Sequence, residues 1–295
     1  MQEKELEIAG GSLHYEIRDG KIAVTGLGGG ASQVSVPERI ENLPVEIIHK
    51  RAFLSKKNLR KVILPDTIRE VGDWAFAYCD SLREIALPRS SISFGRSAFL
   101  ECGNLKEISP RGAGREISLL LAAAVTSLEA YYLLDISEAG SGEWLDKWDQ
   151  KLFSLLYSPD AEGYAKQVLC GEEDYGSTDF EAFLREKRKK KVRLCTLRLL
   201  CPTGLSDERR EKLERYLAEH TKGCESDETW QVVLLEHGND REYYSLFAQL
   251  GCLTEENFQA VVADIGEDKP EMKAYFMRWK EEKLGYGDFF EGLEL

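Results

Sequence analysis

A glycine-rich segment, KIAVTGLGGGA, is the first candidate for chemistry. Gly26, Gly28 and Ala31 match the G-x-G-x-x-[GA] spacing that opens a dinucleotide-binding fold, and they follow a predicted strand. In that fold the third small residue begins a helix whose N-terminus binds the pyrophosphate. Here the chain continues as SQVSVPERI, where alternating β-branched residues and a proline disfavour a helix. We therefore interpret the glycines as a loop and predict no cofactor.

Histidine and cysteine side chains offer no recognisable metal site or nucleophile. The four histidines are scattered, at His14, His49, His220 and His237. The seven cysteines contain no C-x-x-C pair, and their odd number favours buried thiols in a reducing compartment over a disulfide framework. Cys79 and Cys102 occupy equivalent positions of a repeat and Cys195 lies in an apolar run, so we expect all three to be buried.

Acidic side chains cluster at residues 172–174, at Glu255 and Glu256, and around Asp264. All of these groups lie at predicted helix ends or in loops. Acid-base catalysis needs two carboxyl groups held in different environments within one cleft. We interpret the clusters as helix caps and predict no catalytic residue.

The most basic segment runs from Arg185 to Arg193 and reads REKRKKKVR. It could bind phosphate groups or an acidic partner. Alternatively it is a solvated helix face that pairs with acidic neighbours, which is the interpretation we prefer. No aromatic residues interleave with the cations, which argues against single-stranded nucleic acid as a ligand.

Composition limits the class of protein. The chain has 295 residues, of which 43% are hydrophobic and 31% charged, as expected of a folded globular protein. No apolar run approaches the roughly 20 residues of a membrane span, and the acidic N-terminus does not resemble a signal peptide. We therefore expect a cytoplasmic protein. The net charge of −13 argues against a nucleic-acid or anionic-membrane partner.

A 23-residue repeat organises the first part of the chain. Phe53, Phe76 and Phe99 are 23 residues apart, each follows an alanine, and about six further apolar positions repeat at the same step. The segments LRKVILP and LREIALP predict short strands that end at a proline. One such unit cannot bury its own apolar face, so the units must stack.

The repeat resembles the BspA-like class of bacterial leucine-rich repeats, in which a unit reads roughly I-x-x-I-x-x-x-A-F-x-x-C-x-x-L-x-x-I-x-L-P. The resemblance covers about residues 34–110 and departs at Lys56, in the cysteine position, and at Pro110, where a strand leucine belongs. Pro110 therefore marks the predicted end of the array. Upstream, residues 13–17 and 21–25 alternate in polarity around Asp19-Gly20, which predicts a β-hairpin that caps the stack.

The predicted strands define a candidate binding surface. Side chains that alternate with the buried ones face away from the core. They are Lys61, Ile63, Glu84, Ala86, Glu107 and Ser109. Repeat stacks bind partners through such extended faces, although so short an array could equally serve only to support the rest of the chain.

The composition changes after residue 112. Residues 1–112 contain 16 Lys and Arg against 15 Asp and Glu, whereas residues 113–295 contain 23 against 37. We therefore predict two domains, 1–112 and 113–295, the second consisting of stacked helical hairpins. The expected helices are Glu116–Glu138, Gly142–Tyr157, Asp160–Cys170, Thr178–Leu200, Ser206–His220, Asp227–His237, Arg241–Leu250, Thr254–Ile265 and Lys269–Lys283.

The helical part resembles the degenerate αα-repeat domains, ankyrin-like in character, that follow such leucine-rich repeats in Firmicutes. The resemblance rests on VRLCTLRLLCPTGLSDERREKLERYLAEH and AYFMRWKEEKLG. The whole chain is thus predicted to be an α+β repeat protein: a short leucine-rich repeat array with an N-terminal hairpin cap, then an all-α helical-hairpin domain. The acidic groove of such a domain would favour a basic or polar protein partner.

These features predict a non-catalytic protein–protein interaction scaffold. One alternative is an enzyme whose site lies at the domain junction, which would require a cleft with convergent, perturbed titratable groups. Another is a secreted surface adhesin, which would require that the true start of the chain lies upstream. The partner itself is not predicted.

Overall fold

The computed structural model describes residues 3–164, 179–224 and 226–283. The chain divides into two compact units. The N-terminal unit comprises Met1–Tyr157 together with Leu200–Gly204, and the C-terminal unit comprises Ser158–Leu199 and Leu205–Leu295. A repeat array precedes a helical region, which confirms the predicted α+β repeat architecture.

A β-hairpin begins the N-terminal unit, as predicted. Strands β2 (Gly11–Arg18) and β3 (Lys21–Gly29) pair antiparallel. The turn residues Asp19 and Gly20 have φ of 49° and 76°, the left-handed backbone that a tight two-residue hairpin turn requires. Strand β1 (Lys4–Ile8), which the sequence did not predict, adds to the outer edge of β2.

The glycine-rich segment is part of this hairpin. The prediction of a loop there was wrong, because β3 continues to Gly29. The glycines are needed for close approach between the strands: a Cβ atom on Gly28 would lie 2.6 Å from Ser12 Oγ, and one on Gly29 would lie 2.8 Å from Gly11 Cα. The motif therefore serves strand packing, and no helix follows it.

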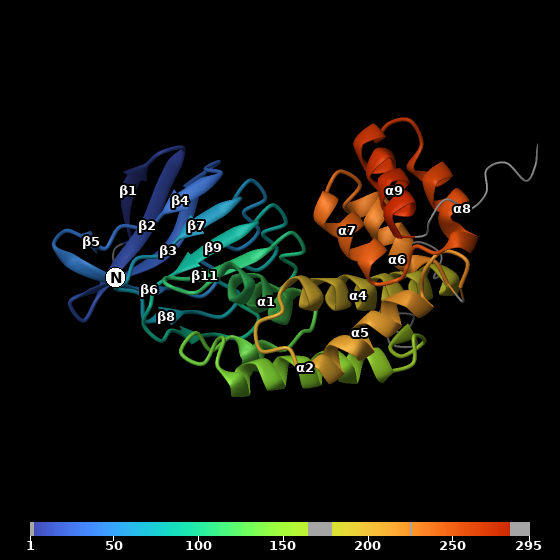
Figure 1. The fold of residues 1–295 in the computed structure, drawn as a ribbon. Coiled ribbons are helices and arrows are strands. Elements are labelled where there is room, and N and C mark those ends of the chain that lie inside the picture. Colours follow the sequence, from blue (N-terminus) through green and yellow to red (C-terminus); the bar gives the residue numbers. More distant parts are fainter. Residues whose placement is uncertain (1–2, 165–178, 225, 284–295) are drawn as a thin grey trace, which may run out of the picture. The chain divides into compact units, whose positions relative to one another are not determined.

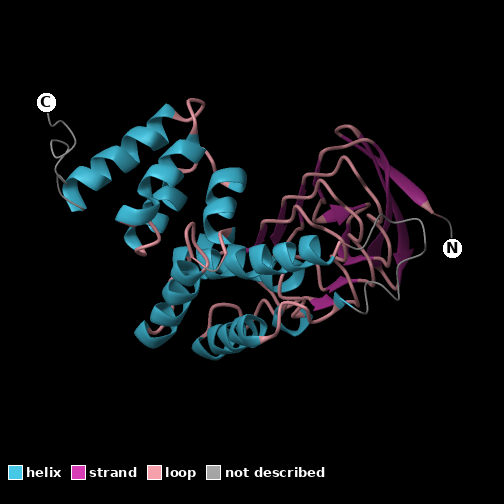
Figure 2. Ribbon diagram, turned by 90° about the vertical axis from the view of Figure 1, so that its right-hand side faces the viewer, coloured by secondary structure: helices cyan, strands magenta, loops and turns pink. Residues whose placement is uncertain are grey.

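Two sheets enclose the core of the repeat array (Figure 1). The first has seven strands, in the order β1-β2-β3-β6-β8-β10, with β5 paired to β6, and the second has four, in the order β11-β9-β7-β4. The remaining strands are β4 (Gln33–Ser35), β5 (Arg39–Ile40), β6 (Leu43–Ile48), β7 (Lys61–Ile63), β8 (Glu70–Val71), β9 (Glu84–Leu87), β10 (Ser93–Phe94) and β11 (Glu107–Pro110). Figure 2 shows the loops that join the short strands of successive rungs lying side by side.

The repeated residues stack into ladders between the sheets. The rings of Phe53 and Phe76 are 4.9 Å apart and those of Phe76 and Phe99 are 5.5 Å apart, nearly parallel in both cases. Beside them the thiol of Cys79 donates to Phe53 O and that of Cys102 donates to Phe76 O, each at 3.0 Å. All five residues are buried. The 23-residue period therefore places like residues in contact.

Two helices close the C-terminal end of the array. Helix α1 (Arg115–Thr126) packs against β11 and buries Leu120, Leu121 and its three alanines. Helix α2 (Gly142–Tyr157) holds α1 through Trp148, whose indole donates to Leu120 O at 3.0 Å. Residues 200–204 return to the same unit, where the Thr203 hydroxyl donates to Glu116 Oε2 at 2.7 Å.

The compact units therefore separate after Tyr157 and not at the predicted boundary of residues 112 and 113. The physical reason is that the last rung of a repeat stack exposes apolar side chains and must be covered. The predicted helix Glu116–Glu138 was wrong in its length, because α1 is shorter. It ends at Thr126, and Glu129 adopts a φ of 53°, before a short 3-10 helix at Tyr131–Leu133.

The C-terminal unit is helical. Its helices are α4 (Phe180–Leu200), α5 (Asp207–Glu219), α6 (Glu228–Gln231), α7 (Arg241–Gln249), α8 (Glu255–Ile265) and α9 (Pro270–Lys283). These agree with the predicted helices to within a few residues, except that a π-helix at Val232–Glu236 continues α6. The predicted helix Asp160–Cys170 extends into residues 165–178, outside the described part of the chain.

Aromatic side chains form the core of this unit. The Trp230 ring contacts those of Tyr244, Phe247 and Phe276, with ring centroids 5.1–6.1 Å apart. All four side chains are buried. The Trp230 indole also donates to Asp264 Oδ2 at 2.9 Å, so one residue joins helices α6, α7, α8 and α9.

Candidate functional site

The outer face of the four-stranded sheet brings the predicted surface residues together. Two rows run across the strands, each formed by equivalent residues of neighbouring rungs in parallel register. The first row contains Gln33, Lys61, Glu84 and Glu107. The second row contains Ser35, Ile63, Ala86 and Ser109. We call these two rows the strand face.

The strand face is accessible, and the positions between its rows are not. All six predicted residues are partly exposed, whereas Val62, Ile85 and Ile108 are buried. Burial of the alternate residues fixes the register, because a shift by one residue would turn the apolar side chains outward. The side chains that face outward are therefore not part of the apolar core.

Two members of the strand face were missed in the sequence. Gln33 and Ser35, on β4, are exposed and extend the face by a fourth rung. Their strand lacks the LxxIxLP pattern, since β4 follows directly from the hairpin cap. Only the alternation of Val34 and Val36 with polar residues indicated a strand there.

Charge on the first row is partly neutralised within the array. Lys61 Nζ lies 2.7 Å from Glu84 Oε1, on the next rung, and both side chains are about one-third exposed. Such an ion pair contributes little stability, about 0.2–1 kcal/mol. The second row offers instead a shallow strip of one apolar and three small side chains. A partner that covers this strip would desolvate few charged groups.

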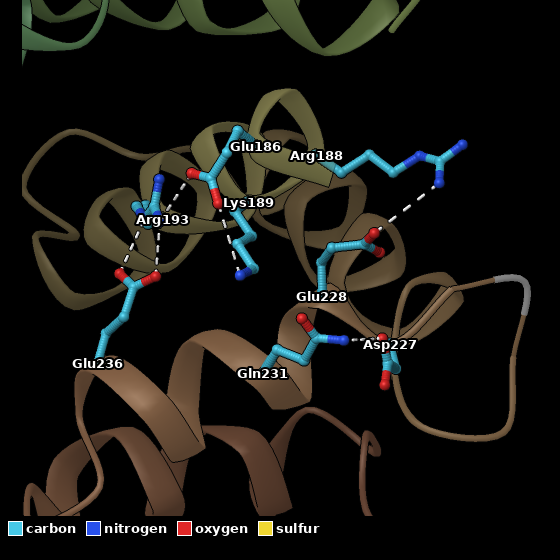
Figure 3. Close-up of polar contacts among 8 residues, drawn as sticks. All are labelled: Glu186, Arg188, Lys189, Arg193, Asp227, Glu228, Gln231 and Glu236. Carbon is cyan, nitrogen blue, oxygen red and sulfur yellow. Dashed lines mark hydrogen bonds and ion pairs between the residues drawn. The ribbon is translucent and has the colours of Figure 1, made fainter. Parts of the chain in front are cut away.

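Cations of the basic segment 185–193 form ion pairs with acidic residues of the same chain. On α4, Arg188 Nε lies 2.9 Å from Asp160 Oδ2, and Lys191 Nζ lies 2.7 Å from Asp160 Oδ1. Arg193 makes two contacts with Glu236, at 2.6 and 2.8 Å (Figure 3). Pairing with acidic neighbours is thus the interpretation that the contacts favour.

The ion pairs shift the pKa values of their members. Burial of the Asp160 carboxyl acts to raise its pKa, but hydrogen bonds from Lys191 and Arg188 outweigh burial, and the pKa is lowered. The hydrogen bond to Glu236 raises the pKa of Arg193. Only 4% of the Lys191 side chain is exposed. This cation is therefore a structural element of the C-terminal unit, where the sequence suggested a solvated face.

Cavities lie within each unit in the described part of the chain. One of about 470 Å³ is lined by Tyr132, Asp135 and Trp144, among others, and one of about 660 Å³ borders the π-helix. A third, of about 370 Å³, lies between the last rung and α1, beside Cys102 and Tyr131. Burial raises the pKa of Tyr131 and that of Cys102 to about 12. Neither group is therefore suited to act as a nucleophile at neutral pH.

The reactivity of the cysteine thiols in the folded protein tests whether they are buried as the structure shows. Burial raises the pKa of Cys79 to about 11 and that of Cys252 to about 12, whereas Cys224 is exposed. A raised pKa lowers the thiolate fraction at pH 7–8. We expect an alkylating reagent to modify Cys224 within minutes and to leave Cys79, Cys102 and Cys252 unmodified until urea is added, as mass spectrometry of the digested protein would show. Rapid modification of Cys102 in the native protein would contradict the assignment.

Within residues 3–164, 179–224 and 226–283, no three His, Cys, Asp or Glu side chains are grouped so that they could hold a metal ion. No helix in that part of the chain is both long and apolar enough to cross a membrane. The described cysteines are free thiols.

Comparisons with known proteins identify the repeat. The family model for BspA-type leucine-rich repeat regions matches residues 33–131, in six copies. A comparison with the curated proteins found no match.

Solved structures of three bacterial leucine-rich repeat proteins match the array. The T. pallidum leucine-rich repeat protein is 29% identical, with a TM-score of 0.28, over 37% of this chain and 51% of that one. A leucine-rich cell surface protein from Faecalibacterium prausnitzii is 23% identical, with a TM-score of 0.30, over 36% and 31% of the two chains. A leucine-rich repeat protein from Bacteroides capillosus is 23% identical, with a TM-score of 0.28, over 37% and 99%. The match thus spans about half of the first protein and a third of the second.

Proposed function

Because residues 33–131 are a BspA-type leucine-rich repeat region, we propose that this protein is a non-catalytic interaction scaffold whose strand face binds a protein partner. Leucine-rich repeat proteins are generally interaction or surface proteins. The observation that carries the proposal is the register of Ile63, Ala86 and Ser109, which forms a continuous, partly exposed strip of small and apolar side chains.

The partner proposed is a protein. A net charge of −13 disfavours long-range attraction of nucleic acid or an anionic membrane. A protein partner can match both rows of the strand face, the charged one and the small, apolar one. Small side chains at Ala86 and Ser109 let a partner approach the sheet closely.

We also propose that the protein is cytoplasmic. The buried cysteines support a reducing compartment, because the thiols of Cys79 and Cys102 are used as donors to Phe53 O and Phe76 O. A disulfide would remove both of these hydrogen bonds. Fractionation of the source cells, followed by immunodetection, tests the location.

A matched pair of variants tests the binding surface. Ala86→Trp would fill the centre of the strand face, while Ser93→Trp would place the same side chain on exposed strand β10 of the other sheet. We expect a partner captured by the wild type from source lysate to be lost about tenfold with Ala86→Trp, because a bulky side chain blocks close packing. Capture by Ser93→Trp should match the wild type.

Each other result of this capture experiment has a different meaning. Retention by both variants would move the binding site away from the strand face. Loss with both would indicate a folding defect, which circular dichroism would detect. A wild type that captures no stoichiometric partner would contradict the scaffold proposal.

A further inference from the structure

A column of cations precedes the strand face. Arg60, Arg83 and Lys106 are the residues directly before β7, β9 and β11, and all three are exposed. Their backbones are linked rung to rung: Arg83 N donates to Arg60 O, and Lys106 N donates to Arg83 O, both at 2.9 Å. Neighbouring strands lie about 4.8 Å apart, so the three side chains arise at that spacing. We call them the basic column.

The basic column is the one column whose charge has the same sign on all three rungs of the 23-residue repeat. Nearby cations alternate with carboxylates and pair with them. Lys57 Nζ lies 2.6 Å from Asp80 Oδ2, and Arg111 Nη1 lies 2.7 Å from Asp66 Oδ2. Among the described residues, none forms an ion pair with a side chain of the basic column.

Stability does not explain this arrangement. Like charges placed side by side on neighbouring strands destabilise a sheet. Alternation of sign, as in the pair Lys61–Glu84, would relieve the repulsion at no structural cost. An anionic ligand that lies along the column would relieve it equally, which makes the column a candidate anion-binding surface.

The residues around the basic column indicate which chemical groups such a ligand would carry. Ile63 and Ala86 follow Arg60 and Arg83 by three residues, a backbone separation of about 10 Å. Between them the pair Lys61–Glu84 is neutralised. On the other side of the column lie the polar residues Asn58, Ser81 and Asn104. These rungs thus expose a cation just before each strand and, at Ile63 and Ala86, partly exposed apolar side chains within two of the strands.

We infer that the strand face together with the basic column binds an acidic amphipathic segment of a partner protein, its carboxylates over Arg60, Arg83 and Lys106 and its apolar side chains over Ile63 and Ala86. The inference rests on the proposed function and adds the chemistry of the partner. A nucleic acid or sulfated glycan would match the cations but not the apolar side chains of Ile63 and Ala86.

The third rung contributes less than the first two. Glu107 follows Lys106 directly and forms no ion pair with another described residue, so it offsets the charge of that rung. Glu84, which follows Arg83, is neutralised by Lys61. We therefore expect the carboxylates of the partner segment to contact Arg60 and Arg83 most closely.

A labelled peptide tests the inference on the full-length protein. The probe is a fluorescein-labelled 15-residue peptide with leucines at helical i, i+3, i+4 spacing and glutamates beside them, and its binding is measured by fluorescence anisotropy. The triple variant Arg60→Gln/Arg83→Gln/Lys106→Gln should bind about tenfold more weakly than the wild type, because three exposed ionic contacts are lost. Arg83→Gln alone should weaken binding more than Lys106→Gln alone.

A matched control variant removes the same charge elsewhere. Lys50→Gln/Arg96→Gln/Arg115→Gln neutralises three exposed cations of the N-terminal unit that lie outside the column, and its affinity should stay within twofold of the wild type. The thermal midpoint of the column variant should equal or exceed that of the wild type, because repulsion is removed. A lower midpoint would show that the column has a structural role and would overturn the inference.

Competing ligands distinguish the remaining outcomes. A lysine-for-glutamate version of the peptide, a heparin oligosaccharide and a single-stranded oligonucleotide serve as probes. Tighter binding of heparin or the oligonucleotide, equal loss in both triple variants, or no binding of the acidic peptide would each overturn the inference. Capture of a partner that Ala86→Trp abolishes but the column variant retains would leave the scaffold proposal standing and refute this one.

Discussion

Replacing Phe76 with alanine should lower the free energy of unfolding of the N-terminal unit by about 3–5 kcal/mol. The Phe76 ring is fully buried and stacks on the rings of both Phe53 and Phe99. Its removal would leave a cavity in the middle of the ladder and separate two rungs that cannot close on each other. Urea denaturation, with hydrogen exchange of peptides from residues 45–110, measures the loss.

Tyr78→Ala is the control for Phe76→Ala. Tyr78 lies two residues away in the same rung, and 43% of it is exposed, so its loss should change stability by no more than about 0.5 kcal/mol. Equal effects of the two substitutions would contradict the assignment of the phenylalanine ladder as the core of the array.

Trp230→Ala should destabilise the C-terminal unit by a similar amount, about 3–5 kcal/mol. The indole is buried at the centre of the aromatic cluster formed with Tyr244, Phe247 and Phe276, and it donates to Asp264. The free energy of unfolding from urea denaturation, with hydrogen exchange of peptides from residues 205–283, reports the change.

Two further substitutions separate packing from hydrogen bonding at this position. Trp230→Phe keeps a ring but loses the donor to Asp264, which still pairs with Lys222 at 2.6 Å, so we expect a smaller loss of about 1–2 kcal/mol. Met277→Ala, at a side chain that is 47% exposed, should cost at most about 0.5 kcal/mol. A loss from Trp230→Phe as large as that from Trp230→Ala would show that the hydrogen bond, not the ring, dominates.

The repeat array was predictable because its information is local and periodic. Phe53, Phe76 and Phe99 recur at one step, and a chain with such a period buries its apolar residues by stacking identical rungs. The alternation of Lys61 and Ile63 with buried Val62 and Leu64 then determined which side chains face outward. The candidate strand face was thus readable before its register was known.

The boundary between the units was not predictable in the same way. The change of composition at residue 112 marks the end of the strands, but α1 and α2 belong to the N-terminal unit. What decides this is contact at long range, such as that of Trp148 with Leu120 and of Thr203 with Glu116. The one local sign was the run LLLAAAV, which is apolar on all sides of the predicted helix.

The charges show the same division between local and tertiary information. The sequence by itself determined the repeat, the hairpin cap, the outward residues and most helices, because each follows from spacing along the chain. Only the tertiary structure decided that the cations at 188, 191 and 193 are paired internally with Asp160 and Glu236, whereas no described residue forms an ion pair with the basic column. A charge run in a sequence shows which side chains are cationic, but Asp160 and Glu236 lie tens of residues away from it, and packing alone brings them to Arg188, Lys191 and Arg193.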